Sequence, residues 1–160
     1  MRKRFLSRKD LFLINFLVVA VDQLSKLWAH QFLNNGGIEP FIPFTLQLRL
    51  VKNTGAAFSL FSNSTTSLKL FSLLVSILFI SWVWRNQLIP FWKGLAIAFL
   101  LGGTIGNGID RWLNGYVIDF FELIPIRFAI FNVADIAINM GIVFLLIDSL
   151  SKRNELRAPK

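Results

Sequence analysis

Four uncharged, mostly apolar runs divide the chain. They cover residues 11–21, 70–84, 94–109 and 136–147. A helix needs about 18 or more apolar residues to cross the hydrocarbon core of a bilayer, and each run reaches that length only when it is extended past an ionisable residue. The pattern therefore predicts four membrane-spanning helices, over about 11–30, 67–85, 88–109 and 132–150, with carboxylates inside the membrane or at its edge.

The first long connection between these helices has the period of a β-strand. Apolar and polar residues alternate from Phe44 to Val51, and Pro40 and Pro43 mark turns just before them. The stretch that follows is uncharged and carries Phe58, which suits the membrane interface. We therefore expect a small sheet and an interfacial segment over about 38–66.

The second long connection is rich in aromatic residues, which favour the depth of the lipid headgroups. We expect this position for Trp112, Tyr116, Phe120, Phe121, Phe128 and Phe131.

The composition agrees with a membrane protein. Hydrophobic residues make up 54% of the 160 residues, charged residues only 16%, and the mean hydropathy is +0.58. Soluble domains carry roughly a quarter charged residues, so this chain is too apolar to present a polar surface all round. We expect one α-helical integral membrane domain over 1–160.

The charge distribution predicts an orientation. The net charge of +8 would suggest a nucleic-acid partner in a soluble protein, but most of the lysines and arginines flank the predicted helices on one side. By the positive-inside rule both termini are cytoplasmic and the two long connections face outward. Asp22 and Lys26 interrupt the first apolar run, and no small-residue cleavage site follows it, so we interpret it as a retained helix. We expect no nucleic-acid partner.

The scarce polar residues restrict the chemistry. The chain has no cysteine and one histidine, His30, which excludes thiol catalysis and disulfides and leaves almost no ligands for a Cys/His zinc site. Carboxylates, hydroxyls or lysines must therefore carry any reaction. We expect neither a metal nor a cofactor.

Three carboxylates lie close to neighbouring helix ends. Asp110 ends the third predicted helix, Asp135 begins the fourth, and Asp119 lies in the link between them. Two carboxyl groups held within hydrogen-bonding reach share one proton, so one can activate water while the other donates to a carbonyl oxygen, as in aspartic peptidases. Asp110 precedes Arg111, whereas Asp119 and Asp135 have drier neighbours, so we favour the latter pair.

Structural interpretations compete at each position. Asn132 and Asp135 have the spacing of a helix N-cap and an acid in the first turn. Asp110 and Arg111 could form an interfacial ion pair, and Asp22 and Lys26 have the i, i+4 spacing of a helical ion pair. Three glycines at small-residue spacing, Gly102, Gly103 and Gly106, favour close helix packing over a catalytic loop.

Other functions are also open at this stage. Intramembrane Asp22, Lys26, Asp110, Asp119 and Asp135 could line the path of a channel or a proton-coupled transporter. A serine–lysine peptidase would use Ser59, Ser62 or Ser64 with Lys69. A subunit of a membrane assembly without activity is a third alternative.

Five stretches, taken together and in order, resemble the lipoprotein signal peptidase (signal peptidase II) family. They are residues 21–26 (VDQLSK), 53–59 (NTGAAFS), 102–111 (GGTIGNGIDR), 117–120 (VIDF) and 131–135 (FNVAD). The resemblance implies a membrane aspartic endopeptidase of the bacterial cytoplasmic (inner) membrane that removes the signal peptide from prolipoproteins, cutting before a diacylglyceryl-modified cysteine. It also implies four helices with a small extracytoplasmic sheet, an adjoining interfacial helix and an active site at the outer face.

The resemblance assigns roles to residues that match the family pattern. Asp119 and Asp135 match the catalytic pair. The surrounding polar residues Asn107, Asp110, Arg111 and Asn132 match its shell, and Asp22, Lys26, Asn53 and Gly55 match positions tied to site architecture and substrate placement. The implied partners are a diacylglyceryl-prolipoprotein and membrane lipid, the implied state is a monomer, and globomycin-type cyclic peptides are the implied inhibitors. Gly108 departs from the pattern, because a bulkier apolar residue is commoner there.

Overall fold

The computed structural model describes residues 4–33, 36–55, 65–126 and 128–157. It contains the helices α1 (Arg8–Phe32), α2 (Thr65–Arg85), α3 (Phe91–Asn114) and α4 (Val133–Arg157). Its strands are β1 (Phe5–Ser7), β2 (Ile38–Ile42), β3 (Leu46–Asn53), β4 (Leu88–Pro90) and β5 (Val117–Leu123). The fold is mostly helical with small antiparallel sheets, as the sequence predicts.

Three helices are long and apolar enough to cross a membrane. They are α1, α2 and the part of α4 up to Arg153, and they expose many large apolar side chains. α3 is long enough at 24 residues, but it packs against each of the other three helices and buries polar residues such as Asn107 and Asp110. A transmembrane course for α3, and hence the count of four spans, stays a prediction.

The glycines of α3 allow its neighbours to approach closely, which confirms the packing interpretation. A Cβ atom on Gly103 would collide with the backbone carbonyl oxygen of Ala134 in α4. A Cβ atom on Gly106 would collide with the Asp22 carboxylate of α1. Gly108, the departure from the family pattern, faces α2, where an added Cβ would lie 3.2 Å from Ser72 Oγ.

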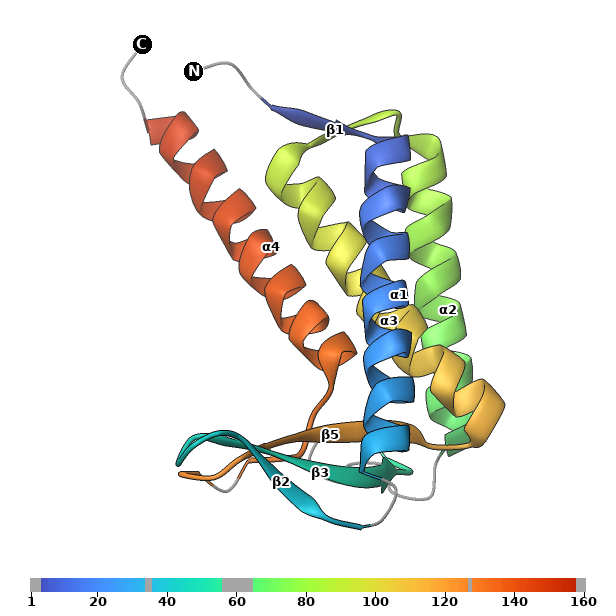
Figure 1. Ribbon diagram of the computed structural model, residues 1–160. Helices are drawn as coiled ribbons and strands as arrows, with labels where there is room; N and C mark the ends of the chain where they lie inside the picture. The colour runs from blue at the N-terminus through green and yellow to red at the C-terminus, as the bar shows by residue number, and fades with distance from the viewer. Residues whose placement is uncertain (1–3, 34–35, 56–64, 127, 158–160) are drawn as a thin grey trace.

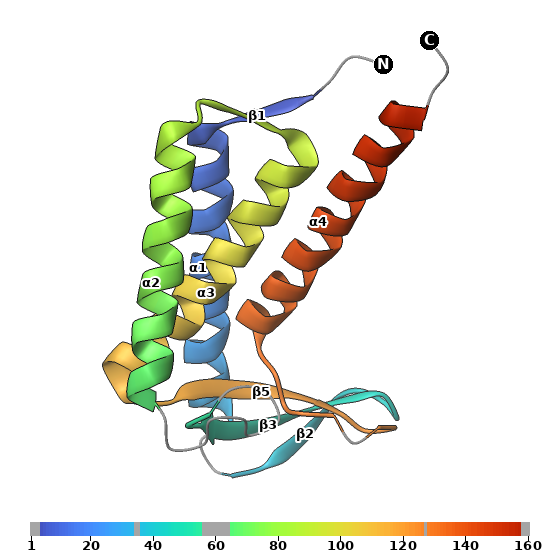
Figure 2. The ribbon, with the colours of Figure 1, turned by 180° about the vertical axis from the view of Figure 1, so that it is seen from behind.

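Figures 1 and 2 show a sheet at each end of the bundle. The strands β2, β3 and β5 form a three-stranded sheet at the end opposite the two termini. β1 pairs with β4 at the other end, close to the start of α1. α4 packs along α3 from its first turn to Phe144, which contacts Trp92 and Phe99, and it diverges from α1 and α2 toward its C-terminal end (Figure 1).

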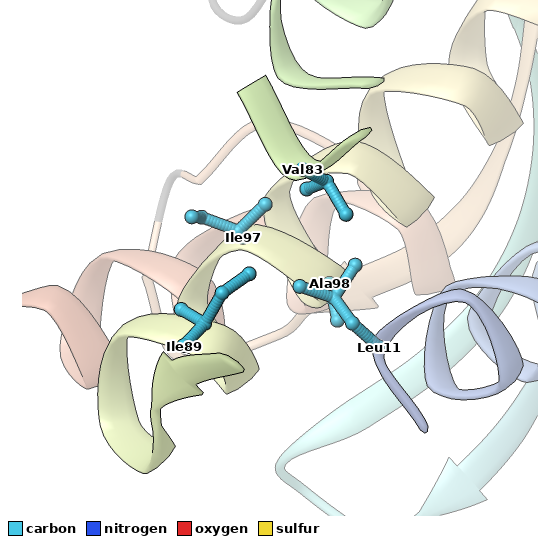
Figure 3. Close-up of a cluster of buried hydrophobic side chains, with 5 residues drawn as sticks. All are labelled: Leu11, Val83, Ile89, Ile97 and Ala98. Carbon is cyan, nitrogen blue, oxygen red and sulfur yellow. The ribbon is translucent and has the colours of Figure 1, made fainter. Parts of the chain in front are cut away.

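Two apolar clusters anchor these ends. Near the termini, Leu11, Val83, Ile89, Ile97 and Ala98 join α1, α2, β4 and α3 (Figure 3). At the other end the three-stranded sheet packs on α1 through Ala29, Leu33, Leu48, Ile118 and Phe120.

Several expectations need correction. The third helix begins at Phe91 rather than at 88, because 88–90 is strand β4, which pairs with β1 near the start of α1. The predicted aromatic connection contains strand β5, and Phe120 is 1% exposed, packed between the sheet and α1. Apolar and polar residues do not alternate regularly along β5, because both faces of this strand are covered. Most of the expected interfacial helix lies outside the described residues.

Candidate functional site

Two of the predicted residues, Asn132 just before α4 and Asp135 in its first turn, form a reciprocal cap. The backbone N–H of Asp135 donates to Asn132 Oδ1 at 3.0 Å, and the backbone N–H of Asn132 donates to Asp135 Oδ2 at 3.1 Å. This is the capping arrangement that the spacing predicts. The cap leaves the Asn132 amide nitrogen and Asp135 Oδ1 free to bond elsewhere.

β5 places Asp119 beside this cap. A bridge between Phe121 and Phe131 brings the chain that follows β5 back along the strand, so that Asn132 lies next to Asp119. Asn132 Nδ2 donates to Asp119 Oδ1 at 2.6 Å. Asn53, at the end of β3, donates to the other oxygen, Oδ2, at 2.8 Å. Asp119 is therefore held from both sides and is only 2% exposed.

Lys26 is the centre of a second, deeper set of contacts. Its Nζ lies 2.8 Å from Asp22 Oδ2, 3.0 Å from Asp110 Oδ2 and 3.0 Å from Asn107 Oδ1. Lys26 and both carboxylates are at most 3% exposed. The predicted Asp22–Lys26 pair is thus confirmed, and Asp110 joins it.

The expected ion pair between Asp110 and Arg111 does not form. Asp110 turns inward to Lys26, and its Oδ2 also accepts the backbone N–H of Ile118 at 3.1 Å. This contact ties the end of α3 to β5. Neighbouring residues on a helix point about 100° apart, so Arg111 has a different surrounding from Asp110.

Lys26 fixes the orientation of the two asparagine amides. An ammonium group only donates, so the atom of Asn107 that faces Lys26 must be its oxygen. Asn107 Nδ2 then points to Asp135 Oδ1, at 2.9 Å, and Asn107 Oδ1 also accepts from Asn132 Nδ2 at 3.1 Å. The chain of contacts therefore presents an N–H group to each of Asp119 and Asp135.

Gln23 is a site residue that the sequence reasoning did not single out. Its Nε2 lies 3.1 Å from Asp22 Oδ2, from Asp110 Oδ1 and from the Gly106 carbonyl oxygen. Asp22 Oδ1 in turn accepts the backbone N–H of Ala134 at 2.8 Å, which ties α1 to the start of α4. The sequence feature that could have indicated Gln23 is its position directly after Asp22, an intramembrane acid.

Arg111 connects the site to the end of β3. It donates to the Gly55 carbonyl oxygen at 3.1 Å and to the Asn107 carbonyl oxygen at 3.4 Å, and the backbone N–H of Gly55 donates to Asn53 Oδ1 at 2.9 Å. No described residue accepts a hydrogen bond from the buried Nε of Arg111. The charges of Asp135, Asp119 and Asp110 stabilise the Arg111 cation.

Burial raises the pKa of Asp119 to about 7. Loss of solvation is the largest cause, and the charge of Asp135 adds to it, because a second carboxylate nearby makes ionisation costlier. The hydrogen bonds from Asn53 and Asn132 and the charge of Lys26 act in the opposite direction, since they stabilise the ionised form. Asp119 therefore holds a proton at a higher pH than an ordinary aspartate does.

Two cavities open beside Asp119. One has a volume of about 660 Å³ and is lined by both Asp119 and Asp135, together with Asn53, Asn107 and Arg111. The other, of about 820 Å³, is lined by Asn53, Gly55 and Asp119. Within the described ranges no group of three His, Cys, Asp or Glu side chains could hold a metal ion.

The structure thus brings all ten predicted site residues into one connected network, drawn from α1, β3, α3, β5 and α4. They are Asp22, Lys26, Asn53, Gly55, Asn107, Asp110, Arg111, Asp119, Asn132 and Asp135. Apolar helices with buried carboxylates at one end of the bundle define a membrane-protein fold with a polar site next to the sheet.

Comparison with known proteins identifies the class. The family described as Signal peptidase (SPase) II matches residues 14–151. A lipoprotein signal peptidase of Parasynechococcus marenigrum is 51% identical over 152 residues, which cover 95% of this chain and 96% of that protein. One of Trichormus variabilis is 44% identical over 137 residues, covering 86% and 87%.

Solved structures agree with these matches. A bacterial membrane enzyme solved by the in meso method at 2.3 Å resolution is 27% identical and superposes with a TM-score of 0.83, over 100% of this chain and 98% of that one. A second bacterial membrane enzyme, solved at 1.9 Å resolution, is 28% identical with a TM-score of 0.80, over 94% and 97%. The chain belongs to the signal peptidase II family, and it is a bacterial membrane peptidase.

Proposed function

We propose that this protein is an aspartic endopeptidase that removes the signal peptide from diacylglyceryl-modified prolipoproteins, cutting before the lipidated cysteine. The observation that carries the proposal is the placement of Asp119 and Asp135 in the wall of one cavity, with Asn132 bonded to both. The names of the relatives, which are lipoprotein signal peptidases, supply the substrate class.

In the proposed mechanism the two carboxyl groups share one proton. Asp119 holds it, because burial raises its pKa to about 7, and Asp135 is the base of the pair. Asp135 takes a proton from a water molecule as the water oxygen attacks the scissile carbonyl carbon, and Asp119 donates its proton to the carbonyl oxygen. In the resulting diol, one hydroxyl proton returns to Asp119, the amide nitrogen takes the proton held by Asp135, and the C–N bond breaks.

The remaining network residues act by positioning in this proposal. Lys26, Asp22 and Asp110 hold Asn107, which donates to Asp135, while Asn53 and Asn132 hold Asp119. Arg111 and Gly55 join the end of β3 to the site and serve substrate placement. The chemistry uses carboxyl groups and water and requires no metal or cofactor.

The proposal includes an arrangement in the membrane. All of 1–160 forms one domain, α3 crosses the bilayer with the other helices, both termini are cytoplasmic, and the site lies at the outer face of the inner membrane. There the acyl chains of a lipid-modified substrate hold the scissile bond at the depth of Asp119. The protein acts as a monomer, and a globomycin-type cyclic peptide is expected to inhibit it.

No specific observation favours the transporter or the serine–lysine alternative. The carboxylates of the network lie together near the sheet, while Asp148 pairs with Lys152 toward the other end of α4. Ser59, Ser62 and Ser64 lie outside the described residues, and Lys69 Nζ lies over the Trp112 ring, 5.7 Å from its centre.

Removal of either catalytic carboxylate tests the proposal. Asp119→Asn and Asp135→Asn are each expected to lower cleavage at least about a hundredfold, because each leaves the pair unable both to activate water and to donate a proton. The assay follows signal-peptide release from a diacylglyceryl-modified prolipoprotein by the purified protein in detergent. Asp148→Asn removes a carboxylate far from the site and is expected to keep activity. Near-normal cleavage by both site variants would contradict the two-aspartate mechanism.

A further inference from the structure

The two cavities beside Asp119 meet at a common boundary. Both are lined by residues of β3, β5 and the segment that follows β5, namely Asn53, Asp119, Leu123, Phe128, Ala129 and Ile130. A peptide bond presented to Asp119 at this boundary can therefore extend into one cavity on one side and into the other cavity on the other side.

The walls of the cavities differ in chemistry. The cavity of about 660 Å³, here called the helix-side cavity, continues between apolar side chains of α2 and α4, such as Phe71, Ile136 and Val143. The cavity of about 820 Å³, the sheet-side cavity, has a polar wall along β3 and β5, with Gln47, Lys52 and Glu122, and an apolar wall formed by the segment after β5, which includes Ile124 and Ile126. The helix-side cavity therefore suits an apolar segment, and the sheet-side cavity also offers polar partners to a segment with polar side chains.

The two halves of the proposed substrate differ in the same way. This step rests on the proposed function: the signal peptide that precedes the scissile bond is an apolar membrane segment, and the mature chain that follows the lipidated cysteine continues into water. Because burial of polar groups without partners is unfavourable, the signal peptide fits the helix-side cavity and the start of the mature chain fits the sheet-side cavity.

We infer that the sheet-side cavity is a binding subsite for the first residues of the mature chain, and that Glu122 gives this subsite a preference for a basic side chain. Glu122 lies three residues beyond Asp119 on β5. At a rise of about 3.3 Å per residue, an extended substrate would reach it with the third or fourth residue after the scissile bond.

The contacts of Glu122 leave it available to a substrate cation. Gln47 Nε2 donates to its Oε2 at 2.7 Å, which fixes the carboxylate in the cavity wall without neutralising it. Arg49 lies 3.3 Å from Oε1, but the Arg49 side chain is 51% exposed, so this contact is weak and open to competition. The Glu122 side chain keeps 22% of its surface exposed.

The test compares two substrates with the purified full chain in detergent. The substrates are diacylglyceryl-modified prolipoprotein peptides that differ only in a lysine or a glutamate at the third and fourth residues of the mature chain. We expect a higher kcat/KM for the lysine peptide, by up to about fivefold, which is the range of a partly exposed ion pair. Glu122→Gln should remove this preference, and Glu122→Lys should reverse it.

Glu39→Gln is the matched control. Glu39 lies on β2 of the same sheet, is exposed and lines neither cavity, so its variant should keep the preference. A substrate-side control needs no variant: lysines moved to the eighth and ninth residues of the mature chain should give the unmodified protein no advantage over glutamates there.

The outcomes separate the two proposals. If both peptides are cleaved but Glu122→Lys keeps the original preference, or the preference does not depend on the position of the lysines, the subsite inference is wrong while the proposed function stands. If the unmodified protein cleaves neither peptide, the proposed function fails and the subsite inference fails with it.

Discussion

The Asp119 side chain combines burial with hydrogen bonds that oppose its protonation. Loss of solvation raises its pKa to about 7, whereas the amide of Asn53 stabilises the ionised form at 2.8 Å. A shift of this kind at a carboxyl group is typical of residues that exchange protons during a reaction. The position of the proton on the pair is thus set by neighbouring side chains from other elements.

The pH dependence of cleavage tests this balance. The pair must hold one proton, so kcat/KM is expected to fall as the pH rises through about 7, where Asp119 loses its proton. Asn53→Ala removes a donor that favours the carboxylate, so the pKa rises and the descending limb should move to higher pH. The measurement is the pH profile of kcat/KM for both proteins. A limb that moves to lower pH, or stays in place, would contradict this account.

The raised pKa of Asp119 also predicts that the stability of the folded protein falls as the pH rises. The folded protein binds the Asp119 proton more tightly than the unfolded chain, whose pKa is near 3.8. The stabilisation from this proton is fully present below pH 3.8 and is lost as the pH rises through about 7.

At the scale of elements, the position of α4 depends on how closely it approaches α3. Gly103 lies against the Ala134 carbonyl oxygen in the first turn of α4, directly before Asp135. Asp22 accepts the Ala134 N–H from the side of α1. The catalytic end of α4 is therefore held by one close backbone contact and one buried hydrogen bond.

An alanine at Gly103 is expected to disturb both stability and activity. The added Cβ would collide with a backbone atom, so α3 and α4 must separate, at a cost of about 1–3 kcal/mol. Thermal unfolding in detergent should show a lower melting temperature, with reduced cleavage at permissive temperature. Gly37→Ala is the matched control, because the nearest atom, Glu39 Oε1, lies 3.7 Å from its added Cβ. Equal melting temperatures for the two variants would exclude the packing role of Gly103.

At the scale of the whole molecule, the termini and the three-stranded sheet lie at opposite ends of the bundle (Figures 1 and 2). If α1, α2 and α4 cross the membrane, both termini share one side only when α3 also crosses it. The course of α3 therefore decides the topology.

Labelling of single cysteines tests this topology cleanly, because the chain has no cysteine of its own. Arg4→Cys, Glu39→Cys and Ser151→Cys place exposed thiols near the N-terminus, in the sheet and near the C-terminus. In sealed vesicles of one orientation, an impermeant maleimide should label Glu39→Cys from one side and the other two variants from the opposite side. Labelling of Arg4→Cys and Ser151→Cys from opposite sides would show that α3 does not cross.

The sequence predicted the helices and the strand that corresponds to β3, because their signals are local, whereas Pro40, expected in a turn, lies within β2 and pairs with Gln47. Run length and hydropathy decide a membrane helix, and alternation over a few residues decides a half-buried strand. The cap formed by Asn132 and Asp135 and the pair formed by Asp22 and Lys26 were also predicted, since each depends on residues three or four positions apart. Asn53, Gly55 and Asn107 were assigned to the site only through the resemblance to the family.

Tertiary structure alone decided the contacts between distant segments. Apolar and polar residues do not alternate regularly along β5, because the sheet, α1 and the segment after β5 cover the strand. β1 and β4 are too short to be recognised as strands from the sequence, since each is stabilised by pairing with the other. The choice of Lys26 rather than Arg111 as the partner of Asp110 depends on the approach of α1 to α3, which no local spacing encodes. The sequence by itself determined which residues could carry chemistry, and long-range packing determined their partners, their burial and the proton on Asp119.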